Sequence, residues 1–111
     1  MRKKINRIID NKIIFKSKKY SLIIGLNPSS GARSPKLWNK VYKKLKINCQ
    51  MYPADISKKN LPSLIKEIKK DDDFLGSAVT MPYKEKILKY IDKIDVNSKK
   101  IGSINTILKK N

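Results

Sequence analysis

The sequence contains no histidine and a single cysteine, Cys49. A zinc site made from cysteine and histidine, a histidine-dependent catalytic triad and an internal disulfide are therefore excluded. Acidic residues are also scarce, nine against 27 Lys and Arg, and none of them forms a pair typical of a glycosidase or a Mg²⁺ site. We therefore expect no metal, and Cys49 is most simply a small apolar residue of a strand.

Long hydrophobic runs and nucleotide-binding glycine motifs are missing too. The N-terminal stretch MRKKINRIIDNKIIF is interrupted by Asp10, Asn11 and Lys12, so it fits neither a signal peptide nor a membrane span. We therefore expect a cytoplasmic protein with no membrane partner. The segment GLNPSSG lacks the spacing of G-x-G-x-x-G, and no P-loop pattern occurs, so no cofactor-binding segment is recognisable.

What the sequence has in excess is positive charge, with a formal net charge of +18. Such a charge is typical of proteins that bind nucleic acid. The lysines, however, are spread over every predicted helix and turn, without a basic stripe interleaved with aromatic residues. Specific nucleic-acid binding is therefore the weakest functional alternative. With 111 residues, 40% of them hydrophobic, the chain is large enough for one domain with its own core.

Apolar runs and helical patterns alternate along the chain. A turn is predicted at the acidic run Asp71–Asp73, which we expect to be solvated. The predicted strands cover residues 21–24, 48–53, 75–79 and 103–108, and the predicted helices begin near residues 34, 61 and 83, with a helical turn at 95–100. This alternation predicts an α/β fold with a mainly parallel, mixed open sheet and helices on both of its faces.

The first of these helices should begin at Ser34-Pro35, because serine is a good N-cap and proline is favoured at the first helical position. Leu37, Val41 and Leu45 recur every four residues. This spacing predicts one buried face.

Residues 1–19 do not join the alternating pattern clearly. Ile5, Ile8 and Ile9 fit one face of a helix, and Lys12–Lys16 fits a short edge strand. We interpret this segment as an N-terminal extension.

Polar residues gather in three segments that should meet at the carboxyl edge of the sheet, where open α/β folds bind their ligands. These segments are Asn27–Ser34, Thr80–Lys84 and Asn105-Thr106. Hydroxyls, a carboxamide, an ammonium and helix N-terminal amides together suit a small polyhydroxylated carboxylate. The simpler alternative is that Lys84 is one of many solvated lysines.

The ordered segments NPSSGARSP, AVTMPYK and IGSINT resemble three motifs of the substrate-binding N-terminal domain of shikimate dehydrogenases. Those motifs read approximately N-P-I-x-H-S-x-S-P, N-V-T-x-P-x-K and G-A-V-N-T, and the resemblance covers roughly residues 20–108. It implies that residues 20–111 are such a domain. In the full enzyme this domain serves the NADP-dependent reduction of 3-dehydroshikimate to shikimate, a step of aromatic amino-acid precursor biosynthesis.

The resemblance also implies roles for four residues. Lys84 matches the catalytic lysine, Thr80 a substrate-contacting threonine, Asn105 the asparagine beside the reacting hydroxyl, and Ser34 the second of two serines that hold the substrate carboxylate. The family pairs its lysine with an aspartate in N-T-D-G and binds NADP in a Rossmann domain, and both follow this segment in the family. We therefore expect this chain alone to be inactive.

Three positions depart from the family pattern. Ala32 replaces the first serine, Gly31 the histidine and Ala78 the asparagine of N-V-T. Ser29 or Ser30 can supply a replacement hydroxyl from the same loop. Quinate or a related cyclitol acid therefore stays open as substrate beside shikimate and 3-dehydroshikimate.

Other functional classes also stay open. The runner-up is a stand-alone, non-catalytic binding module for a small cyclic hydroxy acid, and a basic nucleic-acid-associated protein comes third. A separate chain can supply the nucleotide-binding domain. The chain can also be a fragment, and in that case we expect self-association through the last strand, 103–108, because an edge without its neighbour recruits other chains.

Overall fold

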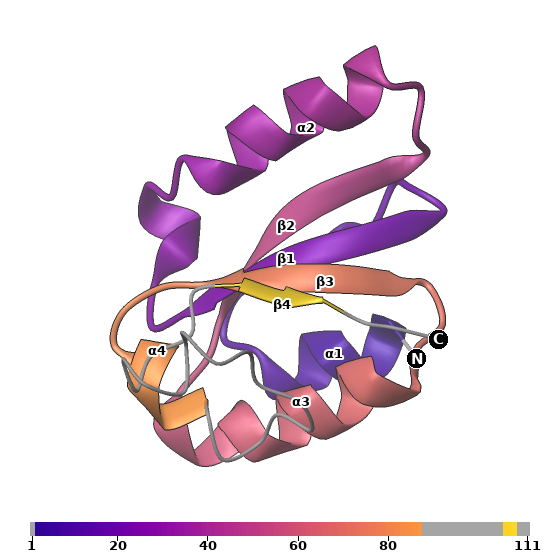
Figure 1. Cartoon of the computed structure of the whole chain (residues 1–111). Coiled ribbons are helices and arrows are strands. Elements are labelled where there is room, and N and C mark those ends of the chain that lie inside the picture. Colours follow the sequence, from indigo (N-terminus) through magenta and orange to yellow (C-terminus); the bar gives the residue numbers. More distant parts are fainter. Residues whose placement is uncertain (1, 88–105, 109–111) are drawn as a thin grey trace.

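The computed structural model describes residues 2–87 and 106–108 (Figure 1). Four strands form one sheet in the order β2-β1-β3-β4. They are β1 (Lys19–Gly25), β2 (Cys49–Asp55), β3 (Phe74–Val79) and β4 (Thr106–Leu108). The helices are α1 (Arg2–Ile8), α2 (Ser34–Lys44), α3 (Leu61–Lys70) and α4 (Tyr83–Lys86), with 3₁₀ turns η1 (Pro28–Ser30) and η2 (Lys58–Asn60). The predicted α/β class is confirmed.

Strand β1 lies at the centre and pairs in parallel with both β2 and β3. Every residue of β1 after Lys19 is buried, on both faces of the sheet, which explains why the strand reads as a continuous apolar run. Strand β4 runs antiparallel to β3, with Thr106 opposite Ala78. The sheet is thus mixed, and the antiparallel direction places the start of β4 beside the end of β3.

Helices cover both faces of the sheet, α1 and α3 on one side and α2 on the other (Figure 1). The hydrophobic core lies under α1 and α3, and the apolar face predicted for α3 is confirmed. That face comprises Leu61, Leu64, Ile65 and Ile68, all buried. The predicted turn at residues 95–100, most of the third helix and residues 103–105 lie outside the described residues.

The N-terminal residues belong to this core. Ile5 and Ile9 are buried in it and Ile8 packs against it, so the predicted helical face is confirmed. None of the described helices combines the length and the apolar character that crossing a membrane requires.

The edge strand predicted over 12–16 is wrong, because this segment has no strand assignment. The side chain of Asn6 accepts the N–H of Ile13 at 2.8 Å and donates to its carbonyl at 2.9 Å. The N–H of Lys16 donates to the hydroxyl of Tyr52 at 2.8 Å. Side chains therefore satisfy backbone groups that a strand would pair with a neighbour.

The buried face predicted for α2 is also wrong. Leu37, Val41 and Leu45 are 61%, 43% and 62% exposed, and α2 contains no buried residue. Arg33, not Ser34, holds the N-cap position, and its side chain makes no capping hydrogen bond.

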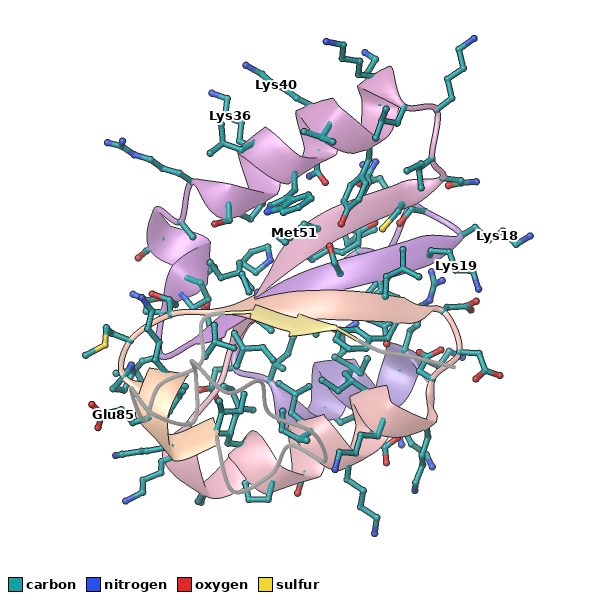
Figure 2. All side chains as sticks on the ribbon, viewed as in Figure 1. Lys18, Lys19, Lys36, Lys40, Met51 and Glu85 are labelled. Atoms are coloured by element: carbon teal, nitrogen blue, oxygen red, sulfur yellow. The ribbon has the colours of Figure 1, made fainter. Side chains whose placement is uncertain are left out.

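Polar side chains hold α2 on the sheet instead. Asn39 accepts the N–H of Met51 at 2.6 Å and donates to its carbonyl at 3.3 Å. The hydroxyls of Tyr42 and Ser21 are 2.9 Å apart. Asn39 and Tyr42 are three residues apart and so share the sheet-facing side of the helix. Figure 2 shows Met51 on β2 below the helix, while the α2 lysines it labels point away from the sheet.

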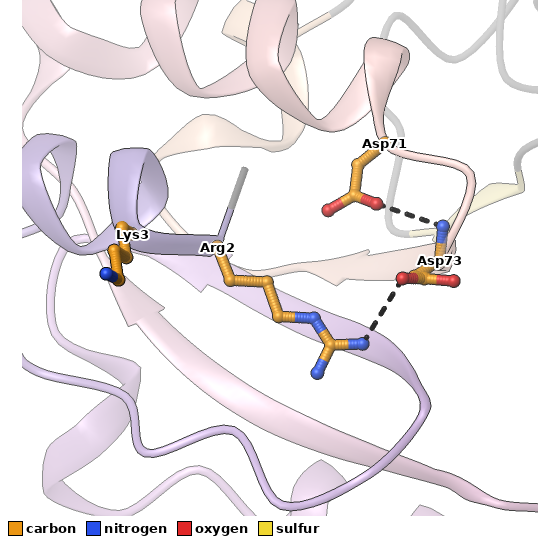
Figure 3. Close-up of a pocket in the computed structure, with 4 residues that line it drawn as sticks. All are labelled: Arg2, Lys3, Asp71 and Asp73. Atoms are coloured by element: carbon orange, nitrogen blue, oxygen red, sulfur yellow. Dashed lines mark hydrogen bonds and ion pairs between the residues drawn. The ribbon is translucent and has the colours of Figure 1, made fainter.

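The amino edge of the sheet carries a small charged depression lined by Arg2, Lys3, Asp71 and Asp73 (Figure 3). The guanidinium of Arg2 lies 3.5 Å from the carboxylate of Asp73 and donates to the carbonyl of Ser17 at 2.7 Å. Because this edge is opposite the ends of β1 and β3 where a ligand is expected, we interpret the cluster as a structural clasp for α1.

Asp71 in this cluster is buried, so the prediction of a solvated acidic turn is wrong at this residue. The hydroxyl of Tyr20 donates to Asp71 at 2.7 Å, and Asp71 also accepts the N–H of Asp73 at 3.0 Å. Burial raises the pKa of Tyr20 far above its usual range, and the hydrogen bond to Asp71 is the second largest cause of this shift.

Candidate functional site at the carboxyl edge of the sheet

The loops after β1 and β3 lie at the same edge, because the two strands are parallel neighbours. Figure 1 shows the start of α2 and the short helix α4 at this end of the sheet. The N–H of Thr80 continues the ladder by donating to the carbonyl of Ile24 at 2.8 Å. Thr80 is therefore fixed at the point where β1 and β3 end.

Gly25 allows this close approach. A Cβ at position 25 would lie closer than 3.0 Å to Cγ2 of Thr80, a separation that real Cβ atoms do not reach. The same Cβ would lie 3.4 Å from the carbonyl oxygen of Met81 and 3.5 Å from Cδ of Pro28. The chain leaving β1 and the chain leaving β3 are thus packed against each other through a glycine.

Lys84 lies one turn beyond Thr80, in α4, and is partly buried. Its neighbour Tyr83 anchors the helix, because this residue is only 1% exposed and its hydroxyl donates to the carbonyl of Ile56 at 2.6 Å. The N–H of Tyr83 donates to the carbonyl of Thr80 at 3.1 Å. Burial raises the pKa of Tyr83, so this anchor stays protonated at neutral pH.

Ser34 is the first residue of α2 and is partly buried. The first turn of α2 contains no acidic residue and no side-chain cap, and its N-terminal N–H groups favour an anion. The topology therefore brings Ser34, Thr80 and Lys84 to one edge. Asn105 lies outside the described residues, but the next residue, Thr106, is paired with Ala78 near the end of β3.

The loop between β1 and α2 folds as the 3₁₀ turn η1 and rests on Asp55, the last residue of β2. Asp55 accepts the N–H of Ser29 at 2.8 Å and also accepts the hydroxyl of Ser29. Ser30 donates its hydroxyl to the carbonyl of Asn27 at 3.0 Å. Each of these serines thus already donates its single hydroxyl proton within the protein, so we assign neither of them to the ligand.

Asp55 is the residue that the sequence interpretation missed, because the predicted strand ended two residues earlier, at Pro53. An acidic residue directly before a buried position, Ile56, is the only signal. The carboxylate under η1 also opposes a phosphate in this loop, so the loop does not fit the pyrophosphate of NADP. Among residues 2–87 and 106–108, no three His, Cys, Asp or Glu side chains are grouped to hold a metal ion.

Comparison with known proteins shows the family to which this chain belongs. The family described as "Shikimate dehydrogenase substrate binding domain" matches residues 23–107, which include all three loops of the site. The chain belongs to the shikimate dehydrogenase family. The fold described above is therefore that of the substrate-binding domain of this family.

Individual relatives also support the family assignment. The shikimate dehydrogenase (NADP(+)) of Pyrococcus furiosus is 41% identical over 86 residues, which cover 78% of this chain and 31% of that enzyme. The crystal structure of shikimate dehydrogenase 1 from Peptoclostridium difficile superposes with a TM-score of 0.77 at 34% identity, over 84% of this chain and 35% of that one.

A shikimate dehydrogenase from Thermus thermophilus, solved with NADP(H) and shikimate, superposes with a TM-score of 0.76 at 25% identity, over 83% of this chain and 34% of that one. This chain thus spans about a third of the length of the relatives it matches.

Proposed function

We propose that residues 20–111 are the substrate-binding and catalytic-lysine domain of a shikimate dehydrogenase, with shikimate and 3-dehydroshikimate as ligands. The observation that carries this proposal is the fixed position of Thr80 at the sheet edge, with Lys84 one turn later. The family match over residues 23–107 supports it.

Each group has a role that its chemistry allows. Ser34 and the first amides of α2 hold the carboxylate of the acid. The hydroxyl of Thr80 and the carboxamide of Asn105 bind ring hydroxyls. Lys84 exchanges a proton with the hydroxyl that is oxidised or formed, a role that typically contributes about 10²- to 10⁴-fold to the rate.

NADP enters this proposal only as the hydride carrier of relatives, whose names and complexes include it. The loop over Asp55 does not fit a dinucleotide, and the sequence holds no G-x-G-x-x-G run. The nucleotide must therefore be held by residues other than these, in the same polypeptide or in a separate chain. We expect this chain alone to reduce nothing, and we place the reaction in the cytoplasm.

The direct test is titration of the ¹⁵N-labelled chain with shikimate. We expect weak binding, because Ala32 replaces a serine, with chemical-shift changes at Ser34, Thr80, Lys84 and Asn105. Loss of one hydrogen bond to a carboxylate costs about 1.5–3 kcal/mol. No change at millimolar shikimate, or changes confined to residues 1–19, would contradict the proposal.

Lys84→Ala tests the lysine separately. The variant should weaken shikimate binding while changing the free energy of unfolding by no more than about 0.5 kcal/mol, as expected for a lysine outside the core. Lys86→Ala is the matched control, because Lys86 is an exposed lysine of the same helix. A large stability loss in Lys84→Ala alone would assign Lys84 a structural role.

The second candidate is a non-catalytic binding module for a cyclic hydroxy acid, which Ala32 favours. A parallel titration with quinate shows which acid the site prefers. Catalysis separates the two candidates: a chain that binds the acid but supports no NADP-dependent oxidation of it when a nucleotide-binding domain is added would favour the module.

A further inference from the structure

A buried carboxylate lies directly beneath the loop that leads to the candidate carboxylate site. Asp55 is 7% exposed. In the described part of the chain no lysine or arginine forms an ion pair with it. A buried charge requires hydrogen bonds when it has no counter-ion. The side chain of Asp55 accepts two hydrogen bonds from Ser29, one from its backbone N–H and one from its hydroxyl.

The backbone of Asp55 is held firmly from the opposite side. Its N–H donates to Oδ1 of Asn11 at 2.8 Å, and its carbonyl accepts the N–H of Asp10 at 2.7 Å. Asn11 also donates to the carbonyl of Pro53 at 2.9 Å. Asp55 is therefore a fixed point at the end of β2, and Ser29 is the part of the contact that belongs to a loop.

Because the loop is short, the position of Ser29 constrains the position of Ser34. Just after η1 the N–H of Ala32 donates back to the carbonyl of Pro28 at 3.0 Å, and α2 begins two residues later. Helix α2 has no buried residue of its own. Its contacts to the sheet through Asn39 and Tyr42 lie beyond the first turn, so the preceding loop sets where that first turn lies.

We propose that Asp55 and Ser29 are positioning residues for the acid ligand. Their double hydrogen bond sets the loop so that Ser34 and the first amides of α2 meet the ligand carboxylate. It also satisfies the oxygens of Asp55, a buried carboxylate with no ion pair among the described residues. This inference rests on the proposed function.

The test compares three variants with the unaltered chain. Ser29→Ala removes the hydroxyl and keeps the backbone N–H, whereas Ser29→Thr keeps both donors. Ser30→Ala is the matched control, because Ser30 is an exposed serine of the same turn whose hydroxyl donates only to Asn27 in the described structure. For each, shikimate affinity is measured by ¹⁵N titration, amide exchange at residue 29 without ligand, and the melting temperature.

Ser29→Ala should weaken shikimate binding about three- to tenfold, the range that one net hydrogen bond covers. Amide exchange at residue 29 should accelerate by a similar factor. Ser29→Thr should restore both quantities, and Ser30→Ala should leave both unchanged. A purely structural role would lower the melting temperature without changing the affinity.

Three results would overturn the inference: equal affinity in Ser29→Ala and the unaltered chain, equal weakening in Ser30→Ala, or no rescue by threonine. If the unaltered chain fails to bind shikimate, the proposed function is refuted and the positioning role falls with it. The exchange rate at residue 29 then still shows whether the contact orders the loop, so the two failures are distinguishable.

Discussion

Replacing Gly25 with alanine should damage the candidate site through a single atom. The new Cβ would lie closer than 3.0 Å to Cγ2 of Thr80, and it also approaches Met81 and Pro28 to within 3.5 Å. Forcing a methyl group into a packed position costs about 1–3 kcal/mol. At roughly 4 °C per kcal/mol for a domain of this size, the melting temperature should fall by about 4–12 °C.

Thr80 can escape the collision only by moving its side chain. Rotation about χ1 turns the hydroxyl away from its present direction, and an off-rotamer position costs about 0.5–1.5 kcal/mol. Gly25→Ala should therefore reduce shikimate binding even where stability recovers in part. Thermal unfolding and ¹⁵N titration measure the two effects independently.

Two further variants make the interpretation of Gly25→Ala specific. Gly31→Ala is the control, because no atom lies within 4 Å of a Cβ at that position; it should change stability by no more than about 0.5 kcal/mol. Adding Thr80→Ser to Gly25→Ala removes Cγ2, keeps the hydroxyl and should restore most of the lost stability. The reasoning is refuted if Gly25→Ala unfolds like Gly31→Ala, or if Thr80→Ser fails to rescue it.

Three other predictions concern the polar contacts of the fold. Tyr20→Phe should lower the free energy of unfolding by about 1.5–3 kcal/mol in urea at pH 7, because buried Asp71 loses its hydroxyl donor; an unchanged midpoint would contradict this. Stability should fall as the pH rises above about 10, because burial raises the pKa of Tyr20 and Tyr83 and the unfolded chain then loses protons that the folded chain keeps. The slope, measured by urea midpoints from pH 8 to 11, should be smaller in Tyr20→Phe. Asn39→Ala should cost about 1–3 kcal/mol in the same assay because it leaves the N–H and carbonyl of Met51 without their partner, and a cost below 0.5 kcal/mol would contradict this role.

The family and the sheet were predictable because three short motifs occur in order and because strands that are buried on both faces read as apolar runs. The face of α3 was predictable for a related reason. Its apolar residues follow the i, i+3, i+4 pattern, which keeps them on one side of a helix. The structure confirms the sheet and the buried face of α3. The family match confirms the family, and it covers the three loops on which the site was predicted.

Helix α2 shows where spacing misleads. A helix has 3.6 residues per turn, so each step of four residues rotates a side chain by about 40°. Leu37, Val41 and Leu45 therefore drift around the helix, and the sheet-facing side belongs to Asn39 and Tyr42. Polar residues that pack through hydrogen bonds leave no hydrophobic pattern, so no periodicity could have found this face.

The contact between Asp55 and Ser29 was unpredictable for another reason. The two residues are 26 positions apart, and only the parallel pairing of β1 and β2 brings the end of one strand beside the loop after the other. The strand predicted over residues 12–16 was wrong for a similar reason, because the backbone of this segment bonds to the side chains of Asn6 and Tyr52. Long-range side-chain partners are visible only in the folded chain.

The polar attachment of α2 has a consequence for affinity. A helix held by a few hydrogen bonds, with no buried apolar side chain, can detach at a free-energy cost well below that of global unfolding. Under the proposed function, only molecules with the helix attached present Ser34 to the acid, so the expected affinity is the intrinsic affinity multiplied by the attached fraction. A bound acid would in turn stabilise the state in which the helix is attached. Ligand binding and the order of α2 are then two measures of a single equilibrium.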